Sequence, residues 1–203
     1  MDEKADQAAL LSALTTEHFV LQTAYSSTVS EASGRSTLYV MALSSSLVAM
    51  GFLSQSQELF KPFIAHVLPA VFLLGLFTVV RLVDTGLESM QYLTGIARIR
   101  GFYRTLGAQA AEHFKPEQGR WPEVKSPAER LGALSAFLGT TASMIAVINN
   151  VVAGAVISLL VHAVAPTLPN WLGIAAGTVS ALMLTAVFLA YQRWRFAVFD
   201  ARV

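Results

Sequence analysis

Apolar residues gather in four long runs along the chain, separated by shorter polar stretches. The runs cover residues 37–54, 63–82, 134–164 and 171–194. A helix needs about 20 mostly apolar residues to cross the hydrocarbon core of a bilayer, and only the first run falls short of this length. The pattern predicts an all-α integral membrane protein, with residues 1–203 forming one polytopic domain around four transmembrane helices.

Short connections join the first run to the second and the third run to the fourth. Their sequences, SQSQELFKP and HAVAPTLPN, contain prolines toward their ends, and prolines at such places favour turns. The four spans are therefore expected to form two helical hairpins, with a long polar segment, residues 83–133, between them.

The basic residues are distributed unevenly around the predicted spans. Of the 14 lysines and arginines, the two short connections contain only Lys61. All the others lie before the first run, around and between the second and third, or at the end of the fourth and after it. Short cytoplasmic loops carry an excess of Lys and Arg. We therefore expect a multi-pass protein of the cell membrane (plasma or inner), with both termini and the segment 83–133 in the cytoplasm.

Residues 1–35 carry a helical pattern outside the spans. Leu11, Leu14, Leu21 and Tyr25 fall on one face of a helix, which predicts an amphipathic cytoplasmic helix. Its polar face is rich in Ser, Thr and Gln, unlike the basic face of a helix that lies on a lipid surface. We therefore expect this helix to pack against a second cytoplasmic helix.

The second cytoplasmic helix is expected to continue from the second span through residues 85–106. Three basic residues of this helix are candidates for binding an anionic lipid headgroup or a phosphate ligand, although anchoring on the cytoplasmic side, with a solvated basic face, is the favoured interpretation. A loop is expected over residues 115–127, and Ser126-Pro127-Ala128-Glu129 predicts a helix start before the third span. The apolar residues on one side are Tyr92, Ile96, Ile99, Tyr103 and Leu106, and the basic candidates are Arg98, Arg100 and Arg104.

Two adjacent asparagines, Asn149 and Asn150, interrupt the third apolar run. A buried primary amide without hydrogen-bond partners costs several kcal/mol, so each needs a partner. Asn150 belongs to a stripe of small and polar residues at helical spacing, whereas Asn149 points about 100° away. Small residues and side-chain hydrogen bonds drive helix pairing in lipid, so contact between helices is one interpretation; a polar constriction in a pore of several subunits is the other. The stripe contains Gly139, Ser143, Asn150, Gly154 and Ser158.

Spans one and four carry related patterns. Ser44 and Ser45 are further candidates for interhelical or pore-facing polar groups, and one serine of the SSS triplet is expected to bond back to its own helix. In the fourth span Gly173, Gly177 and Ala181 form a ridge of small residues that allows close helix packing. The small-residue surfaces of the third and fourth spans are larger than the contacts within one four-helix bundle require. We therefore expect a homo-oligomer.

The tripeptide EHF occurs at residues 17–19 and again at 112–114, an offset of 95 residues. Further matches at this offset fit a parallel duplication of one helix and one hairpin, although chance explains so few identities as well. The two Glu-His pairs could supply four metal ligands, but neighbours on a helix point about 100° apart. No metal site is expected.

Composition and charge narrow the class of protein further. The chain is 54% hydrophobic and 13% charged, whereas soluble domains average about 25% charged residues, so the lipid bilayer is expected to cover much of the surface. It contains no cysteine and has a formal net charge of +1, which gives no reason to expect a nucleic-acid partner. No Asp or Glu lies in a span core, which disfavours proton-driven transport.

No nucleotide-binding, metallohydrolase or nucleophile motif occurs. We therefore expect no enzyme, no catalytic residue and no cofactor. The favoured hypothesis is a homo-oligomeric helical channel or small-solute pathway. The alternative is a non-transporting membrane scaffold or regulatory subunit whose cytoplasmic helices bind a protein partner. An enzyme acting on lipid ranks last.

Overall fold

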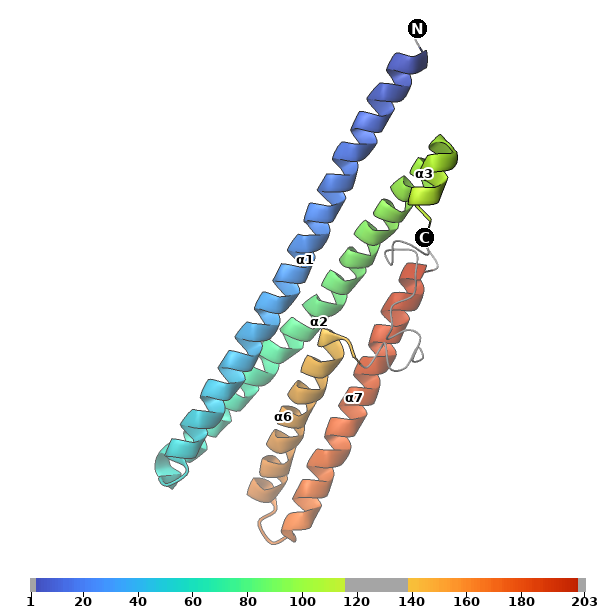
Figure 1. Cartoon of the computed structure of the whole chain (residues 1–203). Helices are drawn as coiled ribbons and strands as arrows, with labels where there is room; N and C mark the ends of the chain where they lie inside the picture. The colour runs from blue at the N-terminus through green and yellow to red at the C-terminus, as the bar shows by residue number, and fades with distance from the viewer. Residues whose placement is uncertain (1–2, 116–138, 201–203) are drawn as a thin grey trace. The chain divides into compact units, whose positions relative to one another are not determined.

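The computed structural model describes residues 3–115 and 139–200, and these contain helices and no strand. The expected loop at 115–127 and the helix start at Ser126 therefore lie almost wholly outside the described residues. Figure 1 shows the elements in chain order. They are α1 (Glu3–Leu53), α2 (Gln57–Tyr103), the 3₁₀ turn η1 (Arg104–Leu106), α3 (Ala108–His113), α6 (Thr141–Val164) and α7 (Asn170–Asp200).

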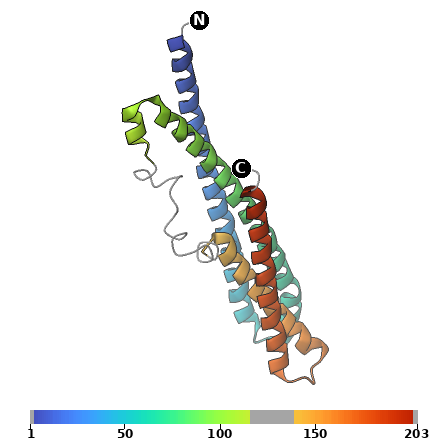
Figure 2. The same cartoon turned by 90° about the vertical axis from the view of Figure 1, so that its right-hand side faces the viewer.

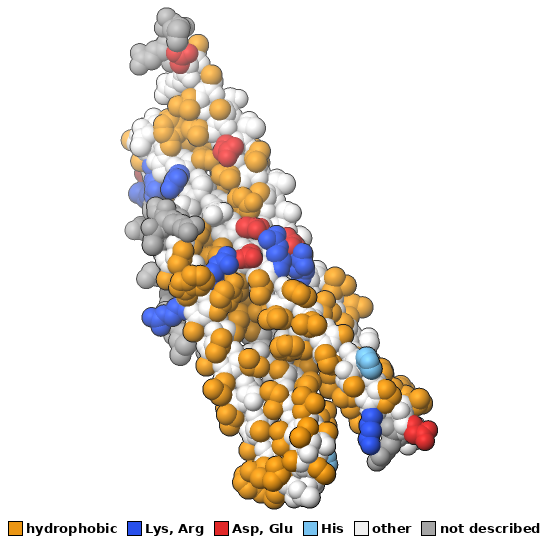
Figure 3. Space-filling model, turned by 180° about the vertical axis from the view of Figure 1, so that it is seen from behind, with side chains coloured by type: hydrophobic (Ala, Val, Ile, Leu, Met, Phe, Trp, Pro, Cys, Tyr) orange, Lys and Arg blue, Asp and Glu red, His pale blue; other side chains and the backbone are white. Residues whose placement is uncertain are grey.

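Four of these helices, α1, α2, α6 and α7, are long and apolar enough to cross a membrane. Each contains a window of 18 residues with a mean hydropathy between 1.6 and 2.4. Many large hydrophobic side chains of these helices are exposed, and Figure 3 shows them as orange surface. The prediction of an all-helical protein with four apolar helices is confirmed.

The helix boundaries differ from those of the predicted segments. Residues 1–35 and 37–54 were expected as two elements, but α1 runs without a break from Glu3 to Leu53. It contains 51 residues and is thus about 77 Å long, whereas the hydrocarbon core is about 30 Å thick. Gly34 at the expected junction does not end the helix, because a single interior glycine costs only about 1 kcal/mol.

The chain divides into two compact units. Unit 1 contains Met1–Glu31 and Asp84–Phe137, and unit 2 contains Ala32–Val83 and Leu138–Val203. Each of the two longest helices, α1 and α2, contributes one part to each unit.

In unit 1, the first part of α1 packs on the last part of α2. Leu21 lies against Gly95, where an added Cβ atom would come within 2.9 Å of its Cδ1 atom. The hydroxyls of Thr28 and Ser89 are 2.6 Å apart, and Thr28 is only 5% exposed. The face that the pattern of leucines predicted for residues 1–35 is therefore the face that packs.

Unit 1 turns sharply after α2. Gly107 has a φ angle of +152°, which L side chains rarely adopt, and α3 begins immediately after it. The rings of Tyr103 and Phe114 then lie 5.3 Å apart. Leu106 falls in η1 and is 39% exposed, so it does not continue the packed side of α2 as expected, because the 3₁₀ turn changes the helical register.

In unit 2, α6 and α7 pack closely against each other, and they lie side by side in both views (Figures 1 and 2). Gly154 and Gly177 form the closest approach, since a Cβ atom at Gly154 would lie 2.5 Å from the carbonyl oxygen of Gly177. Gly173 faces Ser158 in the same way. The ridges of small residues predicted on these two helices thus meet each other.

Candidate functional site

Asn149 lies in the middle of α6 with only 2% of its surface exposed. The Tyr39 hydroxyl on α1 donates a hydrogen bond to its Oδ1 atom at 3.2 Å. Gly75 on α2 leaves room for this amide, because a Cβ atom at Gly75 would overlap Oδ1. Three helices of unit 2 therefore meet at one side chain, which sequence reasoning expected to need a partner different from that of Asn150.

Asn150 is 8% exposed, and its Nδ2 atom donates to Oγ1 of Thr185 on α7 at 3.1 Å. The Thr185 hydroxyl itself donates to the carbonyl of Ala181 at 2.8 Å. Because the one hydroxyl proton is used there, Oγ1 can only accept from Asn150. This fixes the orientation of the amide, with its Oδ1 atom pointing away from Thr185.

A second polar cluster surrounds Gln192 on α7, which is 1% exposed. The Ser143 hydroxyl donates to Oε1 of Gln192 at 3.0 Å, and Nε2 of Gln192 donates to Oγ1 of Thr140 at 3.1 Å. Thr140 is also the N-cap of α6 and accepts from the backbone N–H of Ser143 at 3.2 Å. The start of α6 is thereby tied to α7.

Sequence reasoning missed Gln192, Thr140 and Tyr39. For Gln192 a signal was present, because it is a lone amide among apolar residues near the end of the fourth run. Tyr39 carried no comparable signal, since an aromatic residue near the end of a span is ordinary.

A crevice with a volume of about 260 Å³ opens beside the two asparagines. Its walls are side chains of α2 and α7, and Asn149 and Asn150 of α6 line it together with Ala146. Several wall residues also face outward, among them Leu76, which is 43% exposed, and Val187, which is 66% exposed. The two amides therefore stand in a largely apolar recess. The remaining wall residues are Phe72, Val79, Val80, Leu184, Phe188 and Tyr191.

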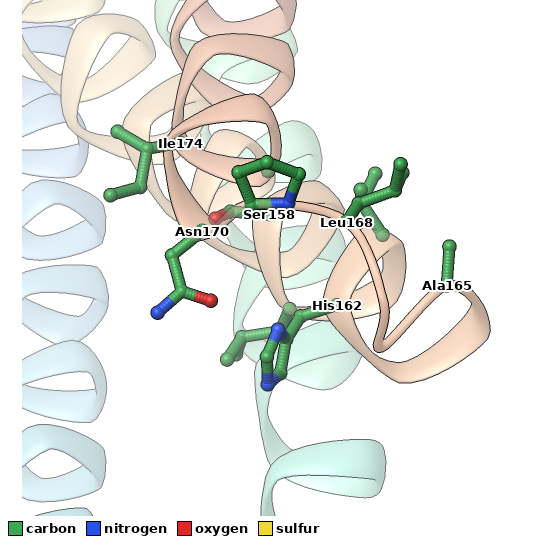
Figure 4. A pocket seen from close by; sticks show the side chains of 10 residues that line it. Ser158, His162, Ala165, Leu168, Asn170 and Ile174 are labelled. Carbon is green, nitrogen blue, oxygen red and sulfur yellow. The ribbon is translucent and has the colours of Figure 1, made fainter.

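A further cavity of about 300 Å³ lies where α6 connects to α7. Figure 4 shows the side chains that line it, with polar atoms supplied by Ser158, His162 and Asn170. Gly173, one of the predicted packing residues, also lines this cavity.

Three predicted site residues are not brought into these clusters. Ser44 and Ser45 are exposed on α1, so they make no buried contact between helices. Ser46 donates to the carbonyl of Ala42 at 2.7 Å, as expected for one serine of the triplet. Gly139 precedes the N-cap of α6 and is exposed, so it is not part of the packing stripe on that helix.

The three candidate arginines of unit 1 have different environments. Arg98 is exposed, whereas Arg100 and Arg104 are half-buried. The Arg100 guanidinium lies 5.7 Å from the centre of the Phe114 ring, a cation–π distance. Binding of an anionic headgroup or ligand by this set stays a prediction.

Among the described residues, no three His, Asp or Glu side chains lie close enough together to hold a metal ion. The Nδ1 atom of His18 is buried and has no hydrogen-bond partner among the described residues. The His18 ring lies edge-on to the ring of Phe19. The two Glu-His pairs do not form a shared cluster in the residues that the structure describes.

Comparison with known protein families, with curated proteins and with solved structures finds no match to this chain.

Proposed function

We propose that α1, α2, α6 and α7 cross the cell membrane as two hairpins, with both termini and residues 83–133 in the cytoplasm. The four apolar helices support the spans. The distribution of Lys and Arg supports the direction, because only Lys61 falls in the two short connections. In this arrangement unit 1 lies in water and unit 2 lies in lipid.

The function that the geometry supports best is that of a membrane scaffold or regulatory subunit whose cytoplasmic helices bind a protein partner. The observation that carries it is the outer face of α1 in unit 1, defined here by Ser12, Thr16, Phe19, Val20 and Thr23. Phe19 is 62% exposed and Val20 is 56% exposed. These two side chains lie opposite the face that packs on α2.

The hydroxyls on this part of α1 are less available to water than the sequence suggests. Thr15 donates to the carbonyl of Leu11 at 2.9 Å, and Thr16 donates to that of Ser12 at 3.0 Å. With its proton used inside the helix, each threonine presents a methyl group and a weakly polar oxygen. The outer face is therefore an uncharged, partly apolar strip, which suits an amphipathic partner helix better than an anionic lipid surface.

Site-specific photocrosslinking in native membranes tests this proposal. A photoreactive residue replaces Val20 in the full chain, and the same residue at the exposed Gln91 of α2 is the matched control. We expect a stoichiometric crosslink to one other protein from position 20, absent from position 91 and lost in Phe19→Glu. Crosslinks from position 20 to lipid alone, or a protein crosslink insensitive to Phe19→Glu, would contradict the proposal.

The homo-oligomeric channel is the second candidate. What favours it is that both asparagines line a recess of unit 2; against it, each amide already uses one of its groups in a bond within the chain. Planar bilayers containing the purified protein test it. Conductance above that of empty bilayers, changed by Asn150→Ala, would support a pathway, and its absence in every oligomeric state would exclude one.

A further inference from the structure

The crevice beside Asn149 and Asn150 has free hydrogen-bonding capacity at its floor. Asn149 uses Oδ1 to accept from Tyr39, and Asn150 uses Nδ2 to donate to Thr185. Within the described part of the chain, Nδ2 of Asn149 and Oδ1 of Asn150 have no hydrogen-bond partner. Neither atom is among those sealed inside the protein without a partner, and both residues line the crevice.

This arrangement provides one donor and one acceptor on adjacent residues, in otherwise apolar surroundings. The two residues are 98% and 92% buried, and their position nine to ten residues into α6 places them about 13–15 Å from the start of that helix. At such a depth in a bilayer no water is available, and an unpaired amide group costs several kcal/mol. A bound molecule that fills both positions removes this cost.

We propose that the crevice binds a neutral lipid that carries a hydroxyl group on a long hydrocarbon chain. A hydroxyl accepts from Nδ2 of Asn149 and donates to Oδ1 of Asn150 with one atom, which a hydrocarbon, an ether or an ester carbonyl cannot do. An ionised headgroup does not fit, because moving a charge into this recess costs far more than two hydrogen bonds return.

The shape of the crevice agrees with this ligand class. A dry cavity of about 150 Å³ lined by apolar residues is enough to hold benzene, so a volume of about 260 Å³ accommodates a hydroxyl and the adjoining part of a chain. Leu76, Val80 and Val187 are wall residues that are also exposed on the outer surface of the spans. The lipid therefore enters sideways from the bilayer, and the rest of its chain remains among other lipids.

Photolabelling of the full chain in phosphatidylcholine nanodiscs tests this proposal. The probe is a long-chain primary alcohol with a diazirine in its chain; the controls are its methyl ether and the same chain without oxygen. Loss of the donated hydrogen bond is worth about 1 kcal/mol, so we expect the ether to label peptides of α2, α6 and α7 at the crevice about fivefold less than the alcohol. Because only the probe changes, the fold of the protein is not disturbed.

Two protein variants complete the test. Val187→Phe narrows the crevice, whereas Val179→Phe makes the same change on α7 at a residue that is 55% exposed and outside the crevice. We expect Val187→Phe to lower labelling by the alcohol at least fivefold and Val179→Phe to leave it unchanged. Equal labelling by alcohol and ether, or labelling that both variants leave intact, would overturn the proposal. Since it does not involve the outer face of α1, its failure would leave the partner-binding function untouched.

Discussion

The two units use glycine in different ways. In unit 1, Gly95 makes room for the flexible side chain of Leu21. In unit 2, Gly154 and Gly177 bring two helix backbones together, with little between them. In water, burying a leucine is favourable in itself. In lipid that gain disappears, and close backbone packing takes its place.

The amide side chains distinguish the units further. Threonine hydroxyls bond to carbonyls of their own helix in both units, as Thr15 and Thr94 do in unit 1 and Thr78 does in unit 2. In unit 2, amides reach from one helix to another, with Gln192 bonded to Ser143 and Thr140 as the clearest case. Side-chain packing therefore determines the helix contact in unit 1, whereas small residues and amide hydrogen bonds determine the contacts in unit 2.

The largest effect is expected for Gly154→Val. Its side chain would collide with the backbone carbonyl of Gly177, which cannot move without separating α6 from α7, so we expect the free energy of unfolding to fall by about 3 kcal/mol. The control is Gly34→Val in α1, where no atom lies within 4 Å of an added Cβ. Unfolding in mixed micelles with increasing SDS measures the stability of both variants. Equal stability of the two variants would contradict the claim that close backbone packing at Gly154 holds α6 against α7.

Gln192→Leu should have the next largest effect. It removes two hydrogen bonds between helices from a fully buried position, and bonds of this kind contribute about 1–2 kcal/mol in membranes. The exposed Gln22 of unit 1 provides the control Gln22→Leu, for which we expect a change within about 0.5 kcal/mol. The same SDS titration reports both values. A Gln192→Leu protein as stable as the parent would show that the cluster does not hold α6 to α7.

A double-mutant cycle separates the two uses of glycine. Gly95→Ala should lower stability by about 1 kcal/mol, and this loss should vanish in the Leu21→Ala background, because the colliding atom belongs to a side chain that has been removed. The corresponding cycle in unit 2, Gly154→Ala with Ala181→Gly, should show no rescue, since the nearer atom is the Gly177 carbonyl oxygen. If stability is restored in both cycles, or in neither, the two glycines do not differ in the way proposed, with Gly95 making room for a side chain and Gly154 allowing contact between backbones.

The smallest effect is expected for Thr28→Val in unit 1. The hydroxyls of Thr28 and Ser89 contact each other, but each also reaches a carbonyl of its own helix, at 2.7 Å and 2.9 Å. Ser89 therefore keeps a partner after the substitution, and we expect a loss of about 0.5 kcal/mol. Thermal unfolding followed by circular dichroism measures this change in stability. The control is Thr23→Val, at an exposed position of the same helix. A loss of stability as large as that of Gln192→Leu would contradict the claim that hydrogen bonds between helices contribute less to unit 1 than to unit 2.

Much of this architecture could be predicted from periodicity. The four apolar runs identified the four long helices, and the leucines near Leu21 identified the packed face of unit 1. The small residues of α6 and α7 identified the faces on which Gly154 and Gly177 lie, and the structure shows that these faces meet. In each case the signal repeats along the chain, so one misplaced residue does not change the conclusion.

The partners of individual polar residues could not be predicted in this way. Periodicity assigns a residue to a face of its helix, but it does not say which residue of another helix lies opposite. The bonds of Asn149 to Tyr39 and of Ser143 to Gln192 join residues 110 and 49 positions apart, and so depend on how the helices assemble. Ser44 and Ser45 show the same limit, because their polarity suggested either a contact between helices or a pore-facing position and did not say which; both are exposed.

The central claim is that lipid surrounds unit 2 and water surrounds unit 1. The chain has no cysteine, so single cysteines can be introduced at matched sites: Val20→Cys in unit 1, where the valine is 56% exposed, and Val179→Cys in unit 2, where it is 55% exposed. The rate of reaction with a charged maleimide is measured on the purified protein in nanodiscs, which expose both faces of the bilayer and contain no other membrane protein. We predict rapid modification of Val20→Cys and none of Val179→Cys until the bilayer is dissolved and the protein denatured. Equal rates at the two positions in the intact bilayer would contradict the claim.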